Sequence, residues 1–213
     1  MVEHAFFDLN GTLFDPSPLG EPLGGDDGFV AAVLDDAVRL AMIATMTRTY
    51  CDFSVLLEAA ARGRLEDAGK TDLLSDVTTA AGRMRPFQDA ADAVRILRGA
   101  GLGVGVLTNS SAATARELIA ASDLELEPIL GSETVQAFKP DPRVYAQAVD
   151  SVSAGAENVI LISAHWWDAL GAKRAGLRAG WVSRTEGRRP AIEPAPDYEA
   201  HDLVGLAATI AER

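Results

Sequence analysis

Hydrophobic residues follow two patterns along this chain. Near its start, and again from residue 90 onward, short apolar runs alternate with stretches whose apolar residues recur three and four positions apart. The runs are typical of buried strands and the stretches of amphipathic helices. Strands are predicted at residues 5–7, 104–107, 128–130, 159–162 and 179–182, and helices at 90–98, from 112 to about 121, 140–148, 167–175 and 202–211. This alternation predicts an α/β fold with a doubly wound, mostly parallel sheet.

The stretch between the first two predicted strands has a different pattern. A loop rich in proline and glycine is predicted at residues 15–28, and a polar, proline-rich one at 186–196. Helices are predicted at residues 29–46, 53–61 (ending near Gly63) and 71–83, with no strand signal among them. We therefore expect an α/β core of residues 1–15 and 86–213, interrupted by a small helical insert of residues 16–85.

The residues after the first predicted strand allow two interpretations. Asp8 at the carboxyl end of a buried parallel strand would lie where ligands bind to α/β sheets. The sequence Asn10-Gly11 between apolar segments is also a strong signal for a tight hairpin turn. Later stretches of the chain favour the first interpretation.

Composition narrows the classes of protein that fit. The 213 residues suit one main domain with an insert, and 48% hydrophobic residues supply an ample core. A net charge of −12 argues against nucleic acid and anionic membranes as partners. A single cysteine, Cys51, fits a reducing compartment, and no secretory signal or apolar span is visible. The sequence predicts a cytoplasmic protein.

Four polar clusters follow predicted strands or precede predicted helices. They contain Asp8 with Thr12, then Thr108 with Asn109, then Lys139, and lastly Ser163 with His165 and Asp168. Each has an ordinary alternative. Thr108 or Asn109 can be a helix N-cap, Lys139 a solvated side chain, Asp168 an acid in a first helical turn, and His165 a helix-entry cap, which we favour over a metal ligand. Together, at one edge of a parallel sheet, they predict a binding or catalytic site.

In this order the clusters resemble the motifs of the haloacid dehalogenase superfamily of hydrolases. The first motif is matched by Asp8-Leu9-Asn10-Gly11-Thr12-Leu13, the second by Thr108-Asn109, the third by Lys139-Pro140-Asp141-Pro142 with Tyr145, and the fourth by the segment from Ser163 to Asp168. The resemblance implies a Rossmann-type core, with the helical insert as the family's cap domain.

Two departures distinguish the branches of that superfamily. Its magnesium-dependent phosphatases carry a second aspartate where this chain has Asn10, and an acid where it has Ala164. A general acid contributes about 10² to 10⁴ in rate, so phosphate transfer would suffer. The L-2-haloacid dehalogenase branch needs neither group and works without metal. The resemblance therefore implies a hydrolase that acts on a carbon–halogen bond without a cofactor, with Mg²⁺ needed only by a phosphatase.

The resemblance also implies roles for individual residues. Asp8 attacks the carbon that bears the halogen and forms an ester, Lys139 holds the Asp8 carboxylate ionised, and Asp168 orients Lys139 or activates water. Thr12, Thr108, Asn109 and Ser163 are expected to position the substrate carboxylate and Asp8 through hydrogen bonds, and Tyr145 to support the site. Substrate-binding positions are also expected at Asn10, where dehalogenases often carry an aromatic residue, and at His165, where some carry asparagine.

A cap arginine meets the departing halide in this branch. The candidate here is Arg39, with Arg48 behind it, although an exposed helix arginine is the ordinary alternative at either position. Another alignment places the expected arginine near Leu34, where none stands. The implied partner is a small anionic substrate, and the resemblance allows a homodimer. The alternatives are a small-molecule phosphatase and a non-catalytic anion-binding relative.

Overall fold

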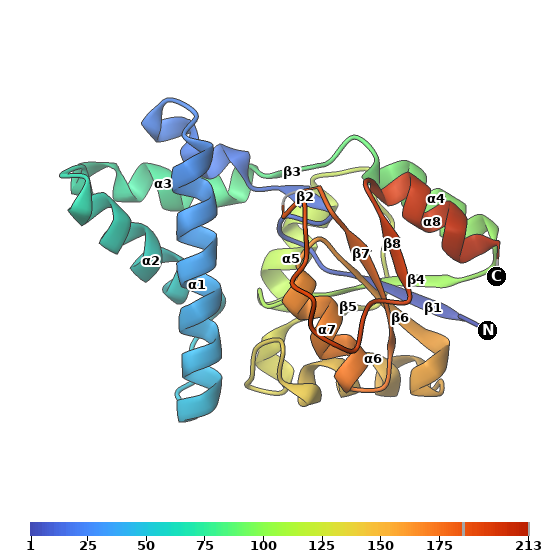
Figure 1. Ribbon diagram of the computed structural model, residues 1–213. Coiled ribbons are helices and arrows are strands. Elements are labelled where there is room, and N and C mark those ends of the chain that lie inside the picture. Colours follow the sequence, from blue (N-terminus) through green and yellow to red (C-terminus); the bar gives the residue numbers. More distant parts are fainter. Residues whose placement is uncertain (185, 213) are drawn as a thin grey trace.

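The computed structural model describes residues 1–184 and 186–212. Its main element is a six-stranded sheet in the order β5–β4–β1–β6–β7–β8, in which every neighbouring pair is parallel (Figure 1). The strands are β1 (His4–Phe7), β4 (Gly103–Leu107), β5 (Ile129–Leu130), β6 (Val159–Ser163), β7 (Arg178–Val182) and β8 (Tyr198–Ala200).

Helices cover both faces of this sheet. On one face lie α4 (Ala90–Gly99), α5 (Ala112–Ala120) and α8 (Leu203–Ala211), and on the other lie α6 (Pro142–Val152) and α7 (Trp166–Arg174) (Figure 1). Neighbouring residues of a strand enter opposite cores: Ala5 and Phe7 pack with the first group, and Phe6 packs with the second. Burial on both faces explains the continuous apolar runs, and the fold is the doubly wound α/β class that was predicted.

β1 is a central strand and no hairpin follows it. Phe7 pairs with Val106 on one side and with Ile162 on the other. The next residue, Asp8, still donates its backbone N–H to the Ile162 carbonyl at 2.9 Å. The chain then turns tightly back on itself through Gly11, whose φ of +79° favours glycine. Asp8 therefore sits at the carboxyl edge of the sheet, which settles the first ambiguity of the sequence.

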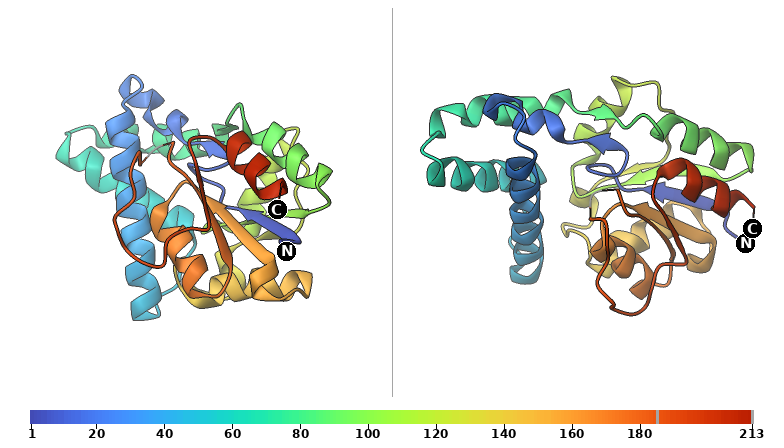
Figure 2. Two further views of the ribbon diagram at one scale, coloured as in Figure 1. Left: turned by 45° about the vertical axis from the view of Figure 1, so that its right-hand side comes forward. Right: turned by 45° about the horizontal axis from the view of Figure 1, so that its top comes forward.

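The helical insert stands to one side of the sheet (Figure 2). It consists of α1 (Asp27–Thr47), α2 (Phe53–Asp67) and α3 (Leu74–Ala80), with 3₁₀ turns η1 (Ser17–Leu23), η2 (Thr71–Leu73) and η3 (Ala81–Arg83). Short antiparallel strands β2 (Phe14–Asp15) and β3 (Arg85–Pro86) pair where the chain leaves the core and returns. The helices pack around a hydrophobic cluster of their own, to which the core contributes Phe138. The division at residues 16–85 stays a prediction that this packing supports.

Three expectations about elements were wrong in detail. η1 lies within the stretch predicted as loop. α2 continues through Gly63 because the burial of Ala60, Ala61 and Leu65 outweighs the cost of a helical glycine, about 1 kcal/mol. β8 was missed because three residues after a proline-rich loop are too few to show a pattern. The remaining 3₁₀ turns are η4 (Ser132–Thr134) and η5 (Ala156–Asn158).

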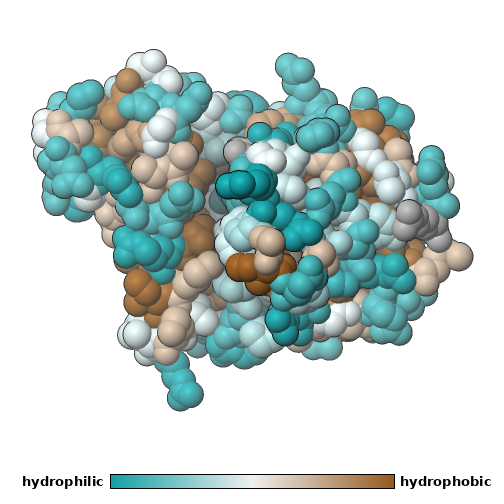
Figure 3. All heavy atoms as spheres, in the orientation of Figure 1, coloured by the Kyte–Doolittle hydropathy of each residue, from teal (hydrophilic) through white to brown (hydrophobic). Residues whose placement is uncertain are grey.

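The surface is mixed in character. On the face drawn in Figure 3, hydrophobic residues lie in separate groups among hydrophilic ones. Across the described part of the chain, none of the helices combines the length and the apolar character that crossing a membrane requires.

Candidate active site

The predicted polar clusters meet at the carboxyl edge of the sheet. Asp8 follows β1, Asn109 lies shortly after β4, and Asp168 lies in the first turn of α7 after β6. Lys139 comes from the loop before α6, and its backbone N–H donates to the Asn109 side-chain oxygen at 2.8 Å. Segments separated by more than a hundred residues thus form one site, because parallel strands place their carboxyl ends together.

Lys139 forms the centre of this site. Its Nζ donates to Asp8 Oδ1 at 3.0 Å and to Asp168 Oδ2 at 2.9 Å, and its side chain has no exposed surface. Burial alone would lower the pKa of Lys139, but the carboxylates of Asp168 and Asp8 outweigh it and raise the pKa above its usual value. Lys139 is therefore a fixed cation that bridges two acids.

Both carboxylate oxygens of Asp168 accept hydrogen bonds from neighbouring side chains. Tyr145 Oη donates to Asp168 Oδ1 at 2.8 Å, while Oδ2 accepts a hydrogen bond from Lys139 Nζ at 2.9 Å. Burial raises the pKa of Asp168, although the Lys139 ammonium opposes that shift, and burial also raises the pKa of the Tyr145 hydroxyl, which stays a donor. A Cβ at Gly171 would lie 2.3 Å from Tyr145 Oη, so the backbone there makes room for the tyrosine. Because Asp168 has no exposed surface, its position supports orienting Lys139 over activating water.

Two more predicted site residues, Thr12 and Ser163, support the site through buried hydrogen bonds. Thr12 Oγ1 donates to Asp8 Oδ2 at 2.9 Å and accepts from the Ala164 backbone N–H at 2.9 Å. Ser163 Oγ accepts from the His165 N–H at 3.1 Å. Thr12, Ser163 and Tyr145 have no exposed surface, so they can position other groups but cannot touch a substrate. The structure thus places Thr12 on Asp8 and Tyr145 on Asp168, as expected of residues that position Asp8 and support the site, but brings none of the three into contact with a substrate.

His165 is the N-cap residue of α7, as expected of a helix-entry position, but its side chain faces the nucleophile region. Its side chain makes no cap hydrogen bond in α7, and its Nε2 lies 3.0 Å from the Asn10 carbonyl and 3.7 Å from Asp8 Oδ2. A Cβ at Gly11 would lie 3.2 Å from that nitrogen, so glycine gives the ring its room. Burial lowers the pKa of His165, but Glu186, Asp8 and the Asn10 carbonyl together raise it to about 9. His165 is thus an imidazolium at neutral pH.

Glu186 is a site residue that the sequence did not reveal. Its Oε1 lies 3.7 Å from His165 Nδ1, and its Oε2 accepts from the Trp166 backbone N–H at 2.9 Å and the Trp181 indole N–H at 3.3 Å. It belongs to a polar loop without periodicity, so no local signal marks it. Its carboxylate provides the second anchor of the His165 ring.

A cavity of about 40 Å³ opens beside Asp8. It is lined by Asp8, Asn10, Leu34, Asp35, Val38, Phe53, Thr108, Asn109, His165 and Trp167. The helical insert supplies apolar side chains and one acid to this lining, and the core supplies the polar groups. Trp167 stacks on the His165 ring with centroids 5.5 Å apart. Thr108 and Asn109 reach the cavity, as expected of substrate-side residues.

The structure does not bring Arg39 to this cavity. Its side chain is 64% exposed and pairs with Asp36 at 3.0 Å. The face of α1 that meets the cavity carries Leu34, Asp35 and Val38, whereas the Arg39 guanidinium turns to Asp36 outside the cavity. Arg48 borders a different surface hollow. The expectation of a halide-binding arginine at position 39 was wrong, and the alternative alignment near Leu34 fits the geometry without supplying an arginine.

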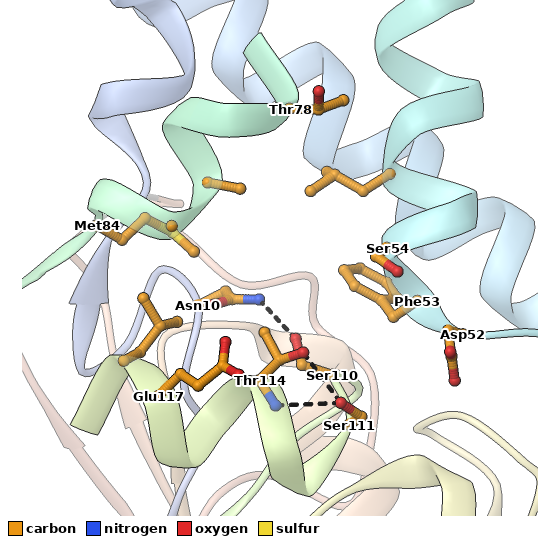
Figure 4. A pocket seen from close by; sticks show the side chains of 14 residues that line it. Asn10, Asp52, Phe53, Ser54, Thr78, Met84, Ser110, Ser111, Thr114 and Glu117 are labelled. Carbon is orange, nitrogen blue, oxygen red and sulfur yellow. Dashed lines mark hydrogen bonds between the residues drawn. The ribbon is translucent and has the colours of Figure 1, made fainter. Parts of the chain in front are cut away.

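A larger cavity of about 310 Å³ adjoins the first (Figure 4). Asn10 and Phe53 line both cavities. Asn10 Nδ2 donates to Ser110 Oγ at 3.3 Å, and Asn10 Oδ1 is buried without a hydrogen-bond partner. The Asn10 side chain therefore stands between the two spaces.

The residues present do not fit Mg²⁺. That ion requires oxygen ligands in an octahedral arrangement. Lys139 Nζ already lies between the carboxylates of Asp8 and Asp168, and both oxygens of Asp168 are engaged. Asn10 and Ala164 stand where phosphatases carry acids. Within residues 1–184 and 186–212, no three His, Cys, Asp or Glu side chains gather in a way that could hold a metal ion.

Fold and site together define an α/β enzyme with an accessible aspartate at the end of its first strand, beside a buried lysine. The chain belongs to the haloacid dehalogenase-like hydrolase family, and the sequence model of that family matches residues 2–176.

Relatives with known names agree with this membership. The chain is 27% identical to an (S)-2-haloacid dehalogenase of Pseudomonas fluorescens, over 97% of this chain and 95% of that protein. It is 28% identical to an (S)-2-haloacid dehalogenase of Pseudomonas sp. (strain YL), over 92% and 89%. Its fold is similar to that of the L-2-haloacid dehalogenase from Xanthobacter autotrophicus, with a TM-score of 0.88, 22% identity and coverage of 99% and 98%.

Proposed function

We propose that this protein hydrolyses the carbon–halogen bond of a small 2-haloalkanoic acid, without a metal, through an ester on Asp8. The observation that carries the proposal is the Lys139 ammonium, held 3.0 Å from Asp8 and 2.9 Å from Asp168. A fixed cation in this place holds a nucleophilic carboxylate in position without a metal ion. Full-length relatives named (S)-2-haloacid dehalogenases support the substrate class.

The first step is a displacement at saturated carbon. A carboxylate oxygen of Asp8 attacks C2 of the substrate, a carbon–oxygen bond forms, and the halide leaves with the electron pair of the broken bond. Lys139 and Thr12 each bond one oxygen of Asp8, at 3.0 and 2.9 Å, and fix the plane of the carboxylate. Halide departs as a stable anion and needs no proton, so this step is not slowed by Asn10 standing in place of a proton donor.

His165 supplies the positive charge that an anionic substrate needs. Among the described residues that line the cavity beside Asp8, it is the one side chain that can be cationic. The insert contributes Asp35 there, which repels an anion, so the substrate carboxylate belongs on the opposite side, near His165 and Asn109. The positive charge of the imidazolium attracts that carboxylate, which is a different role from the halide binding expected of Arg39.

The second step releases the product. Water attacks the carboxyl carbon of the Asp8 ester, a 2-hydroxy acid leaves, and the Asp8 carboxylate is restored. Lys139 Nζ, 3.0 Å from Asp8 Oδ1, stabilises the oxyanion that develops. Of the two protons of the water, one ends on the hydroxyl group of the product and the other is released to solvent as Asp8 returns to a carboxylate.

The test is halide release from (S)-2-chloropropionate in excess chelator. We expect chelator-insensitive turnover that Asp8→Asn and Asp8→Ala lower by at least about 10⁴-fold, as the loss of a covalent nucleophile does elsewhere. In a single turnover in ¹⁸O-water, mass spectrometry should find the label on the peptide containing Asp8. Phosphate-ester hydrolysis stimulated by Mg²⁺ without halide release would favour a phosphatase. A fully active Asp8→Ala variant would exclude the ester.

A further inference from the structure

The two cavities differ greatly in size. One water molecule needs about 10–15 Å³ of cavity volume, so the cavity of about 40 Å³ beside Asp8 holds only a few atoms. Ligand pockets usually measure about 300–1,000 Å³, and the adjoining cavity of about 310 Å³ reaches that range. The space at the nucleophile can take the reacting carbon, the halogen and the carboxylate, but no extended chain.

We propose that the larger cavity holds the tail of the substrate, so that this protein prefers 2-haloalkanoic acids whose carbon chain extends well beyond C3. The inference rests on the proposed function and adds the chain length and tail chemistry of the substrate. C2 lies at Asp8, the carboxylate lies near His165, and the tail passes Asn10.

Asn10 is the divider that makes this path available. It lines both cavities, and its hydrogen bond to Ser110, at 3.3 Å, is long. The Asn10 Oδ1 atom is buried without a hydrogen-bond partner, which is unfavourable for a polar atom. The present rotamer is therefore weakly held, and a turn of this small amide joins the two spaces. Figure 4 shows Asn10 beneath the open volume between α2, α3 and α5.

The lining of the larger cavity determines which tails fit. Phe53, Leu57 and Leu118 give it an apolar wall, and Thr78 and Thr114 also line it, with their hydroxyl groups bonded to the Leu74 carbonyl and to Ser111 Oγ. The lining also contains the acids Asp52 and Glu117, and among its described residues there is no lysine, arginine or histidine. A second carboxylate would meet repulsion without a counter-charge. The tail should therefore be uncharged and largely aliphatic.

The experiment compares kcat/KM for halide release from the (S) forms of 2-bromopropionate, 2-bromohexanoate and 2-bromosuccinate. We expect 2-bromohexanoate to exceed 2-bromopropionate by at least about tenfold, the lower end of what one methylene in a fitted pocket provides. We expect 2-bromosuccinate to be the poorest substrate.

A pair of variants on α5 locates the effect. Thr114→Phe places a ring in the larger cavity, and Ala113→Phe adds the same ring to the neighbouring exposed position outside it. Thr114→Phe should reduce the hexanoate-to-propionate ratio of kcat/KM by about tenfold or more, and Ala113→Phe should leave the ratio as in the wild type. Both sites are exposed, so the variants should fold, which circular dichroism checks.

The outcomes separate this inference from the proposed function. Halide release from 2-bromopropionate that depends on Asp8, with equal activity on 2-bromohexanoate and no effect of Thr114→Phe, would overturn the inference alone. Preference for 2-bromosuccinate would overturn the assignment of an uncharged tail. Absence of halide from every acid would overturn both proposals.

Discussion

At the scale of single residues, Lys139 is the buried cation that pairs with the carboxylates of both Asp8 and Asp168. Lys139→Met would leave the carboxylates of Asp8 and Asp168 facing each other without a cation. Removing one member of a buried ion pair costs about 3–5 kcal/mol. We expect a loss of that size in the free energy of unfolding, measured in urea, together with loss of halide release.

Lys173→Met is the matched control for that change. Lys173 Nζ binds both oxygens of Asp197 at 2.9 Å, but its side chain is 21% exposed. Exposed pairs contribute about 0–1 kcal/mol, so this variant should lose far less stability and keep its activity. Equal losses in the two variants would contradict the central role of Lys139.

His165 leads to a pH dependence with a definite sign. Its pKa in the folded protein is about 9, above the usual 6.5, so the imidazolium that binds an anionic substrate is present at neutral pH and lost above about pH 9. We expect kcat/KM to fall as the pH rises through 9. The same shift stabilises the fold, fully below pH 6.5 and less as the pH rises to 9.

Variants of the two histidines test this assignment. His165→Asn should remove the alkaline fall of kcat/KM and lower its value at pH 7.5 by about tenfold to a hundredfold, since a hydrogen bond to a charged group contributes about 1.5–3 kcal/mol. His201, bonded to Ser183 on the surface, is the control, and His201→Asn should leave the pH profile unchanged. An alkaline fall that persists in His165→Asn would assign it to another group.

At the scale of elements, Phe138 joins the insert to the loop that carries Lys139. Its ring stacks on Tyr50 with centroids 5.1 Å apart, and its backbone N–H donates to Thr45 Oγ1 at 3.0 Å. Phe→Ala changes in a core cost about 3–5 kcal/mol. Phe138→Ala should lose about that much stability and raise KM, because the insert supplies one wall of the cavity.

Two milder variants calibrate this prediction. Phe138→Leu keeps most of the apolar contact, and Tyr50→Phe keeps the ring while it removes a hydroxyl 3.1 Å from Ser132 Oγ. A single hydrogen bond contributes about 0.5–1.5 kcal/mol, so Tyr50→Phe should cost no more than that. Thermal unfolding and limited proteolysis near Gly24 and Met84 measure the effects. An unchanged KM in Phe138→Ala would show that the insert is held by other contacts.

The elements also show what the sequence could reveal. Asp8, Asn109 and Asp168 were predictable because a parallel sheet must bring the ends of β1, β4 and β6 together, whereas Lys139, in the loop before α6, was predicted from the resemblance to the family's third motif. Arg39 was misplaced because the resemblance to the family is loose across the insert, and the broad apolar stripe of α1 does not fix the rotation of the helix about its axis. The position of Glu186 depends on the path of a long loop. Tertiary contacts determine that path, so no local pattern in the sequence could predict it.

At the scale of the whole molecule, the net charge of −12 opposes the approach of an anionic substrate. The attraction of His165 acts at short range, whereas the repulsion of the surface acts at long range and is screened by salt. The Debye length falls from about 30 Å at 0.01 M to about 8 Å at 0.15 M ionic strength. Adding salt should therefore weaken the repulsion more than the attraction.

We accordingly expect kcat/KM for 2-bromopropionate to rise about two- to fivefold between 0.01 and 0.15 M ionic strength, with kcat little changed, because screening removes an unfavourable long-range field. Sodium methanesulfonate is the suitable salt, since its anion is monovalent and cannot act as a halide product. A steady fall of kcat/KM with salt would mean that the imidazolium of His165 and the ammonium of Lys139 dominate the field beyond the mouth of the cavity. Asp35→Asn separates these cases, because it removes one negative charge from the cavity lining and should raise kcat/KM most at low salt.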